Sequence, residues 1–322
     1  MWVGERLAPA ANRPTRSRKR SPEFQEERML MSKCLRLAAR CLALLGAFGA
    51  GSAMQAAEVA PPRAALKVCA PPFSLPMSEK DGSGYENKIA TLFAEQLKLP
   101  LQYTWFPQRM GFVRATLKNN ETDDGSYKCD LVIGVVDNFD LAATSRPYLR
   151  STWAMVYVKG RGLDFIKTQD DLKKLTAAQK KLLKIGIWDQ GPTTEWVYNL
   201  GLMDNATPFP IMSGDARQGP GHIIEDELIA DKVKLTFAWG PIAGYLAKKI
   251  TAQQLVVIPL NNDHGVKFDF QIAMAVRHGD GAWLHQINDL IATNQPKIER
   301  ILDDYGVPRL PLLPPKKAAT DD

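Results

Sequence analysis

The Gly-Pro-Thr-Thr sequence of residues 191–194 is a candidate binding turn for a small anion or a carboxylate. A helix is predicted to begin there, so its first backbone NH groups lack partners and carry the positive end of the helix dipole. Thr193 and Thr194 add two hydroxyls at the same place. The alternative is that one of these threonines only caps the helix, a common role for threonine. The turn alone leaves ligand binding and capping open.

The sequence contains none of the motifs that common hydrolases, metalloproteases and nucleotide-binding enzymes use. It has no HExxH, no Gly-x-Ser-x-Gly, no P-loop and no glycine fingerprint for nucleotides after a strand. The four histidines, His222, His264, His278 and His285, are dispersed, and no cysteine spacing fits a metal site. Carboxylate pairs such as Asp123-Asp124 fit solvated surface charge. We expect a protein that is not an enzyme and has no cofactor and no metal.

The cysteines predict one disulfide in the secreted protein. Cys34 and Cys41 fall in the leader described below, which leaves Cys69 within the first predicted strand and Cys129 just before another. Those strands can be neighbours in a parallel sheet, so the two thiols can reach each other in an oxidising compartment. The alternative is a pair of free thiols in the core.

The elements that must position these residues begin with a strand, a turn, a helix and a second strand. Residues 66–70 are an apolar strand and residues 80–84 form a turn. Apolar residues at helical spacing follow at 89–97, Pro100 ends that helix, and residues 101–106 are rich in β-formers. A helix between two strands is the βαβ unit, which places ligands at the carboxyl ends of its strands.

A second βαβ series follows, and the chain then returns to the first. Further strands are expected at residues 130–135, 153–158, 184–188, 233–239, 255–259 and 268–276, and helices at 168–175, after 191, at 283–292 and at 296–305. We therefore predict an α/β fold of two βαβ lobes joined by two crossings, with a cleft between them. The expected ranges are a linker at 58–65, a first lobe at 66–157 and 266–308, a second lobe at 158–265, and a flexible tail at 309–322.

Several longer motifs resemble a known family. They are Gly-Tyr-Glu-Asn-Lys-Ile-Ala at 84–90, Trp-Phe-Pro-Gln-Arg at 105–109, Cys-Asp-Leu-Val-Ile-Gly-Val at 129–135, Arg-Pro-Tyr-Leu-Arg-Ser-Thr at 146–152 and Trp-Gly-Pro-Ile-Ala-Gly-Tyr at 239–245. The first resembles the opening of type 2 periplasmic solute-binding proteins. Together they resemble the MxaJ and XoxJ type, the binding-like proteins encoded with quinoprotein methanol dehydrogenases, from about Leu66 to Pro311.

The resemblance implies a type 2 periplasmic binding fold and an accessory of a PQQ-dependent methanol dehydrogenase that aids its assembly or maturation. The implied partner is the dehydrogenase, with a small apolar or anionic ligand as a further possibility. The alternative is a substrate-binding protein of an ABC transporter that delivers a small solute other than an amino acid.

Amino-acid receptors of this fold carry an arginine before the Pro-Tyr motif and an aspartate in a second-lobe strand. Here the segment before Pro147-Tyr148 lacks the early arginine, and Trp239 stands in place of the aspartate. Arg146 is displaced along the chain, so it replaces the arginine only in part or is structural. Since a bidentate guanidinium clamp recognises the carboxylate, we expect weak binding of amino acids or none.

Aromatic residues accumulate at predicted strand ends and turns of the cleft. If exposed, they would form an apolar patch of the kind that serves protein partners or apolar ligands; the alternative is core packing, which we favour for Trp105 and Phe106. The candidate cleft residues are Phe73, Tyr85, Glu86, Arg146, Trp188, Thr193, Thr194 and Trp239.

The N-terminal residues predict a secreted protein. Lys33, Arg36 and Arg40 precede the apolar run 41–50, which is too short to span a membrane, and small residues follow, as in a signal peptide cleaved between about Ala53 and Ala57. We expect translation to start at Met29 or Met31, with residues 1–28 as an upstream extension. Residues 1–57 hold the whole net charge of +6, and the rest contains 31 residues of each sign. Neither nucleic acid nor stable membrane insertion is expected.

Overall fold

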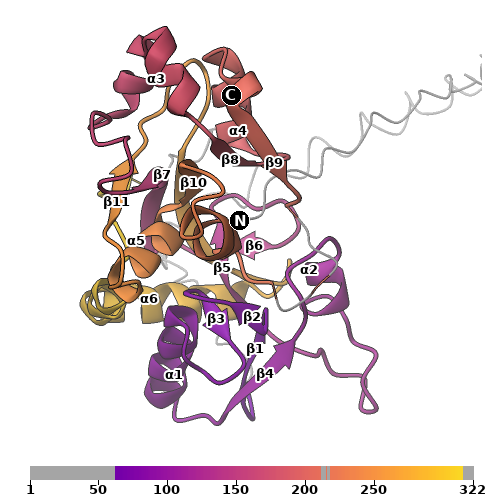
Figure 1. The fold of residues 1–322 in the computed structure, drawn as a ribbon. Coiled ribbons are helices and arrows are strands. Elements are labelled where there is room, and N and C mark those ends of the chain that lie inside the picture. The colour runs from indigo at the N-terminus through magenta and orange to yellow at the C-terminus, as the bar shows by residue number, and fades with distance from the viewer. Residues whose placement is uncertain (1–61, 212–214, 216–217, 315–322) are drawn as a thin grey trace, which may run out of the picture. The chain divides into compact units, whose positions relative to one another are not determined.

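The first lobe is a sheet of parallel strands completed by one antiparallel strand from late in the chain. Its elements are β1 (Leu66–Ala70), β2 (Phe73–Ser74), β3 (Ser78–Glu79), α1 (Tyr85–Leu97), β4 (Leu101–Trp105), α2 (Phe112–Ala115), β5 (Leu131–Val136), β6 (Ala143–Thr144), β12 (Asp269–Val276) and α6 (Gly281–Asp304). β1 lies between its parallel neighbours β4 and β5, and β12 pairs antiparallel with β5. The structure is a computed structural model that describes residues 62–211, 215 and 218–314 (Figure 1).

The helix α1 forms where the helical spacing predicts it. Ile89, Ala90 and Phe93 are fully buried on one face of the helix, which packs near β4 and β5 and against α6. Lys98 ends the helix in the left-handed conformation, and its backbone NH still bonds to carbonyls of the last turn. The helix start places Tyr85 and Glu86 near the carboxyl ends of β1 and β5.

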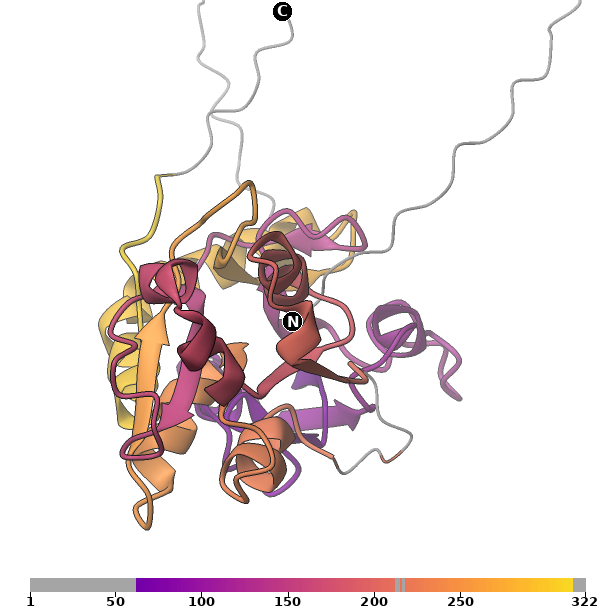
Figure 2. The ribbon, with the colours of Figure 1, turned by 45° about the horizontal axis from the view of Figure 1, so that its top comes forward.

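The second lobe is also a mixed sheet. Its elements are β7 (Leu149–Val158), the 3-10 helix η1 (Gln169–Lys174), α3 (Ala177–Leu182), β8 (Ile185–Trp188), α4 (Pro192–Asn199), the 3-10 helix η2 (Met203–Asn205), β9 (Ala206–Phe209), the π-helical segment η3 (Ile223–Leu228), β10 (Leu235–Trp239), α5 (Gly240–Lys249) and β11 (Leu255–Pro259). β8 lies between its parallel neighbours β9 and β10, while β10 and β11 flank β7 and run antiparallel to it. Figure 2 shows β11, in orange, beside β7, in magenta.

The strand β7 is the first crossing between the lobes. Its residues 149–152 pair with β12 of the first lobe, and residues 153–158 pair with β10 and β11 of the second. The change of sheet falls after Thr152, within the strand, whereas the sequence predicts a lobe boundary after residue 157. No turn marks the change in the sequence, because the strand is continuous and only its partners differ.

The return crossing is bonded to the first one. Thr152 Oγ1 donates to the carbonyl of Leu260 at 2.6 Å, and the NH of Leu260 donates to Trp153 at 2.8 Å. Arg150 on β7 donates from Nε and Nη2 to one oxygen of Asp269 on β12, at 2.8 and 2.6 Å. Two βαβ lobes joined by two crossings are therefore present as predicted.

The C-terminal helical region is one helix rather than the two predicted. α6 continues through Pro296, where a break was expected. Proline removes one backbone hydrogen bond of a helix interior. The buried residues nevertheless continue at helical spacing on both sides of it: Trp283, Ile287, Ile291, Asn294, Ile298 and Leu302. We conclude that burial of this long stripe outweighs the local cost of the proline. Figure 1 shows α6 (yellow) alongside α1, at the other end of the chain.

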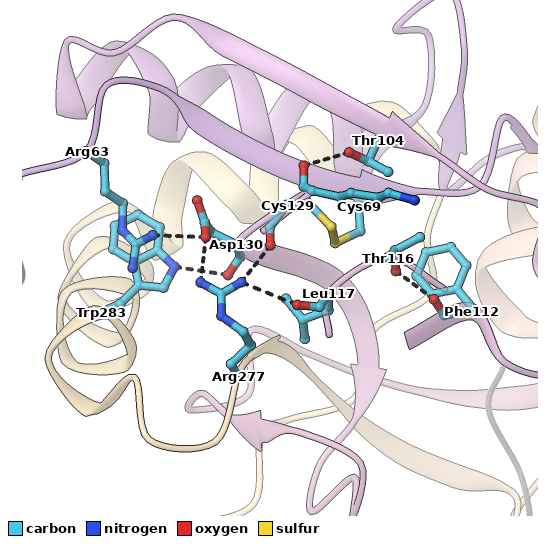
Figure 3. Close-up of a disulfide and its surroundings, with 11 residues drawn as sticks. Arg63, Cys69, Thr104, Phe112, Thr116, Leu117, Cys129, Asp130, Arg277 and Trp283 are labelled. Carbon is cyan, nitrogen blue, oxygen red and sulfur yellow. Dashed lines mark hydrogen bonds and ion pairs between the residues drawn. A yellow bond between two sulfur atoms is a disulfide. The ribbon is translucent and has the colours of Figure 1, made fainter. Parts of the chain in front are cut away.

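The predicted disulfide between Cys69 and Cys129 is present. The residues lie on β1 and directly before β5, with Cα atoms 5.5 Å apart, and both are buried in an apolar cluster with Phe112, Val113 and Leu117. Figure 3 shows the bridge beneath the first-lobe strands.

An ion-pair network lies next to the disulfide. Asp130 forms ion pairs with Arg63 at 3.1 Å and with Arg277 at 2.6 Å (Figure 3). Both arginines also form ion pairs with Asp280, at 2.8 and 3.4 Å. Arg63 also lies over the ring of Trp283 at 4.3 Å. Residue 63 was predicted to belong to a linker, and it is instead attached to the lobe.

The start of the predicted flexible tail is also bonded. The NH of Leu310 donates to Arg150, and that of Leu313 to the side chain of Gln271. Arg309 bonds to both oxygens of Asp303, at 2.8 and 3.0 Å. Residues 309–313 therefore follow the crossing strands. The predicted leader at 1–57, residues 58–61 and residues 315–322 lie outside the described residues. Within the described part, no helix has the length and apolar character of a membrane span.

Candidate functional site

A small cavity of about 40 Å³ lies at the carboxyl ends of the central first-lobe strands. Its polar lining residues are Ser74, Glu86 and Gln108, and its aromatic ones are Tyr85, Phe112 and Trp239. Trp239 comes from the end of β10 in the second lobe, so both lobes contribute. One water centre needs roughly 10–15 Å³, so the cavity admits only a few water-sized groups. Strand ends of this kind are where ligands bind in α/β sheets.

Glu86 is the only ionisable carboxylate among the described residues that line the cavity. Its side chain is on the first turn of α1, and the residue is 7% exposed. No described residue donates a hydrogen bond to its carboxylate. Burial raises the pKa of Glu86 to about 8, because the charged form loses its hydration.

Gly134 makes room for this carboxylate. It lies within β5 at φ +84°, and the register of β5 against β12 shifts there, between Ala273 and Met274. A Cβ at residue 134 would lie 2.1 Å from Oε1 of Glu86, far inside contact distance. The glycine bulge therefore lets the side chain of Glu86 lie against the strand backbone.

Glu86 acts on the pKa of three tyrosine hydroxyls. Burial is the main cause that raises the pKa of Tyr85 and Tyr148 well above 10, and the nearby Glu86 adds to it. The same two causes raise the pKa of Tyr103. These hydroxyls stay neutral near pH 8, so they can donate hydrogen bonds but cannot neutralise a carboxylate.

Glu86 should make the stability of the protein depend on pH. Between pH 4.5, its ordinary pKa, and about pH 8, the folded state keeps a proton that the unfolded chain has lost. The free energy of unfolding should therefore fall by on the order of a few kcal/mol as pH rises through this window. In Glu86→Gln this part of the fall should disappear, as measured by urea unfolding at pH 5 and pH 8. Glu95→Gln, an exposed position on the same helix, should keep it. Equal slopes in wild type and Glu86→Gln would contradict the assignment.

The structure brings three of the predicted site residues together and separates the others. Tyr85, Glu86 and Trp239 line the cavity. Phe73, on β2 near the lining residue Ser74, is 37% exposed and is not part of the lining. Arg146 is exposed and does not line the cavity. It therefore does not restore the missing carboxylate clamp inside it.

The two cleft tryptophans are buried, so they form no exposed apolar patch. Trp188 is 9% exposed and packs edge-to-face against His222 at 5.1 Å, and Trp239 is 6% exposed and packs against Phe270 at 6.1 Å. Of the two possibilities that the sequence left open for these rings, core packing is the one that the structure shows. Trp105 and Phe106 are partly buried; Trp105 stacks on Tyr103 at 4.5 Å, and Phe106 packs on the cluster around the disulfide, in line with the core packing favoured for them.

Neither threonine of the predicted anion turn caps the helix that follows it. Gly191 is the residue before the helix, at φ +145°, and no side chain caps the helix there. Thr194 Oγ1 donates to the carbonyl of Trp188, which ties the turn to the end of β8. Thr193 is fully buried, and its hydroxyl has no partner among the described residues. Neither residue lines the cavity.

The cavity lining includes Ser74, Gln108, Phe112 and Gly134, which the sequence did not single out as site residues. Ser74 Oγ donates to Gln108 Oε1 at 3.2 Å, across 34 residues of sequence. A glycine in the middle of the predicted strand 130–135 was the available signal, because such a glycine marks a bulge or a close approach. Nothing local indicated the other three. The described residues contain no group of three metal-ligating side chains.

Two hinged βαβ lobes with a cavity at their strand ends define the class: the protein has the type 2 periplasmic binding protein fold. No protein-family model matches the sequence. Protein MoxJ of Methylorubrum extorquens is 30% identical over 276 residues, which cover 80% of this chain and 86% of MoxJ.

Two solved structures of periplasmic binding proteins are similar to this chain over most of its length. The periplasmic binding protein XoxJ from Methylobacterium extorquens AM1 has a TM-score of 0.60 and 29% identity, and the match covers 77% of this chain and all of XoxJ. MxaJ from Methlophaga aminisulfidivorans MPT has a TM-score of 0.61 and 26% identity over 76% of this chain and all of MxaJ. The chain belongs to the family of periplasmic binding proteins that includes MoxJ, MxaJ and XoxJ, as its motifs predicted.

Proposed function

We propose that the protein is a periplasmic, non-enzymatic accessory of a PQQ-dependent methanol dehydrogenase and aids the assembly or maturation of that enzyme. The observation that carries the proposal is membership in the MoxJ, MxaJ and XoxJ family over most of the chain. The motifs at 105–109, 129–135 and 239–245 tie the sequence to the members of this fold that are encoded with such dehydrogenases.

The cavity supports an accessory role over amino-acid transport. No Arg or Lys of the described chain lines it, and Trp239 occupies the place where amino-acid receptors of this fold carry an aspartate. A volume of about 40 Å³ has no room for an amino-acid side chain together with its ammonium and carboxylate groups.

The disulfide supports export to the periplasm. Cys69 and Cys129 are bonded and buried within the first lobe, and such bonds persist in oxidising compartments. The signal peptide and its cleavage site between about Ala53 and Ala57 are part of this proposal.

Phe73 provides a surface probe for dehydrogenase docking. It is an exposed aromatic side chain on β2, next to the cavity lining, and aromatic anchors typically cost about 2 kcal/mol on truncation, or about thirtyfold in Kd. We expect the purified protein to bind methanol dehydrogenase in surface plasmon resonance, and Phe73→Ser to weaken that binding at least tenfold. Leu182→Ser is the matched control, because Leu182 is also exposed but lies on α3 in the second lobe (Figure 1).

A gene deletion tests the role in the cell. Loss of the protein should lower the yield of active, PQQ-loaded dehydrogenase in methanol-grown cells, and wild type supplied in trans should restore it. If the dehydrogenase neither binds the protein nor loses activity in the deletion strain, the accessory role is wrong and a transport receptor for a small solute is favoured.

A further inference from the structure

We propose that the cavity beside Glu86 binds a small primary ammonium ion, with methylammonium as the representative of the class. This inference does not depend on the dehydrogenase role, because it concerns the isolated protein. It rests on the charge, the aromatic lining and the size of one cavity.

The charge of the site selects a cation. Glu86 is buried, and no described residue forms a hydrogen bond or an ion pair with its carboxylate. An ionised carboxylate without a partner is costly in a protein interior, so it must either hold a proton or meet a positive charge. No Lys, Arg or His of the described chain lines the cavity to supply that charge.

The aromatic lining favours an ammonium group over a metal ion. Tyr85, Phe112 and Trp239 line the same cavity as Glu86. Aromatic faces attract ammonium groups, Trp most strongly, and they also accept the apolar methyl of an alkylammonium. A hard metal cation would require several oxygen ligands, and the described residues provide no group of three carboxylate, His or Cys side chains.

The size of the cavity selects the smallest members of the class. A volume of about 40 Å³ holds only a few water-sized groups, which suits ammonium or methylammonium. The bulkier tetramethylammonium does not fit. Amino acids are excluded for two reasons. They are larger than the cavity, and their carboxylate would be repelled by the carboxylate of Glu86.

Binding of a cation should be linked to proton release. Among the described residues, the titratable groups that interact with Glu86 are Tyr85 on the same helix, Tyr103 on β4 and Tyr148 before β7, and all three stay neutral near pH 8. Glu86 is thus the group whose ionisation matters. Below about pH 8 the cation must displace its proton, so affinity should rise about tenfold per pH unit and then level off.

The experiment is calorimetric titration of the purified protein with methylammonium chloride at pH 6, 7, 8 and 9. Sodium chloride holds the ionic strength constant. We expect saturable binding that strengthens about tenfold from pH 6 to pH 7 and levels above pH 8. Tetramethylammonium, glycine and methanol should bind at least tenfold more weakly at pH 8.

Two variants locate the site. Glu86→Gln should weaken methylammonium binding at least tenfold at pH 8 and abolish its pH dependence, while Glu95→Gln on the exposed face of α1 should bind as wild type does. If Glu86→Gln does not fold, the pH series of the wild type and its comparison with tetramethylammonium still test the proposal. Absence of saturable binding at pH 8, equal affinity for methanol, or unchanged binding in Glu86→Gln would overturn the proposal.

Discussion

Replacing both Cys69 and Cys129 by alanine is expected to lower the free energy of unfolding by about 4 kcal/mol. The bridge joins residues 60 apart in the sequence, and closing a loop of that length restricts the unfolded chain by about this amount in the chain-entropy model. The bridge also lies in the centre of an apolar cluster between β1 and β5, so its loss leaves unfilled space in the core. This is a large part of the stability of an ordinary domain.

Guanidinium unfolding followed by tryptophan fluorescence measures this difference. Wild type unfolded in the presence of reductant is the control, and it should approach the double variant. Peptide mapping without reductant should recover the segments of Cys69 and Cys129 linked. Two free thiols at these positions in the purified secreted protein would show that the bridge does not form.

Trp188→Ala and Trp239→Ala are each expected to destabilise the protein by about 3–5 kcal/mol, the usual cost of truncating a buried tryptophan. Both side chains are more than nine-tenths buried, and each packs against another ring. The sequence alone left open whether these rings are exposed for a partner or packed in the core. Their burial decides for core packing, so the first effect of truncation is a cavity in the core.

Chemical unfolding of the two variants beside Tyr198→Ala tests whether the two rings are packed in the core. Tyr198 is an aromatic side chain of the same lobe, on α4, and is 71% exposed, so its truncation should change stability by no more than about 0.5 kcal/mol. If the tryptophan variants are as stable as the tyrosine variant, the rings are not packed as described. The docking role would then regain support.

Local patterns in the sequence account for most of the regular elements. Strands β1, β4, β5, β8, β10, β11 and β12 and helix α1 fall within a few residues of the predicted ranges. Each is marked by apolar residues at its own spacing, and β1, β4, β10 and α1 also have glycine or proline at an end. The sequences of strand β9 and of the π-helical segment η3 show no clear apolar spacing. Only the structure located these two elements.

The family and the disulfide were also readable from the chain. Five short motifs indicated the family. The disulfide was indicated by the positions of Cys69 and Cys129 at two strands that are parallel neighbours. The family prediction depends on residues that are close in sequence. The disulfide prediction depends on the usual pairing of parallel strands in a βαβ unit. Neither requires knowledge of how one side chain packs on another.

The sequence by itself determined the two βαβ lobes, their family and the bonded cysteine pair, because these follow from local periodicity and repeated motifs. Only the tertiary structure decided which strand-end residues form a site. Glu86 lies against Gly134 because a bulge in β5 meets the first turn of α1, and Trp239 joins them from the other lobe. Likewise α6 stays whole across Pro296 because its buried stripe continues along the first lobe. Such contacts join segments far apart in the chain, so no local pattern can encode them.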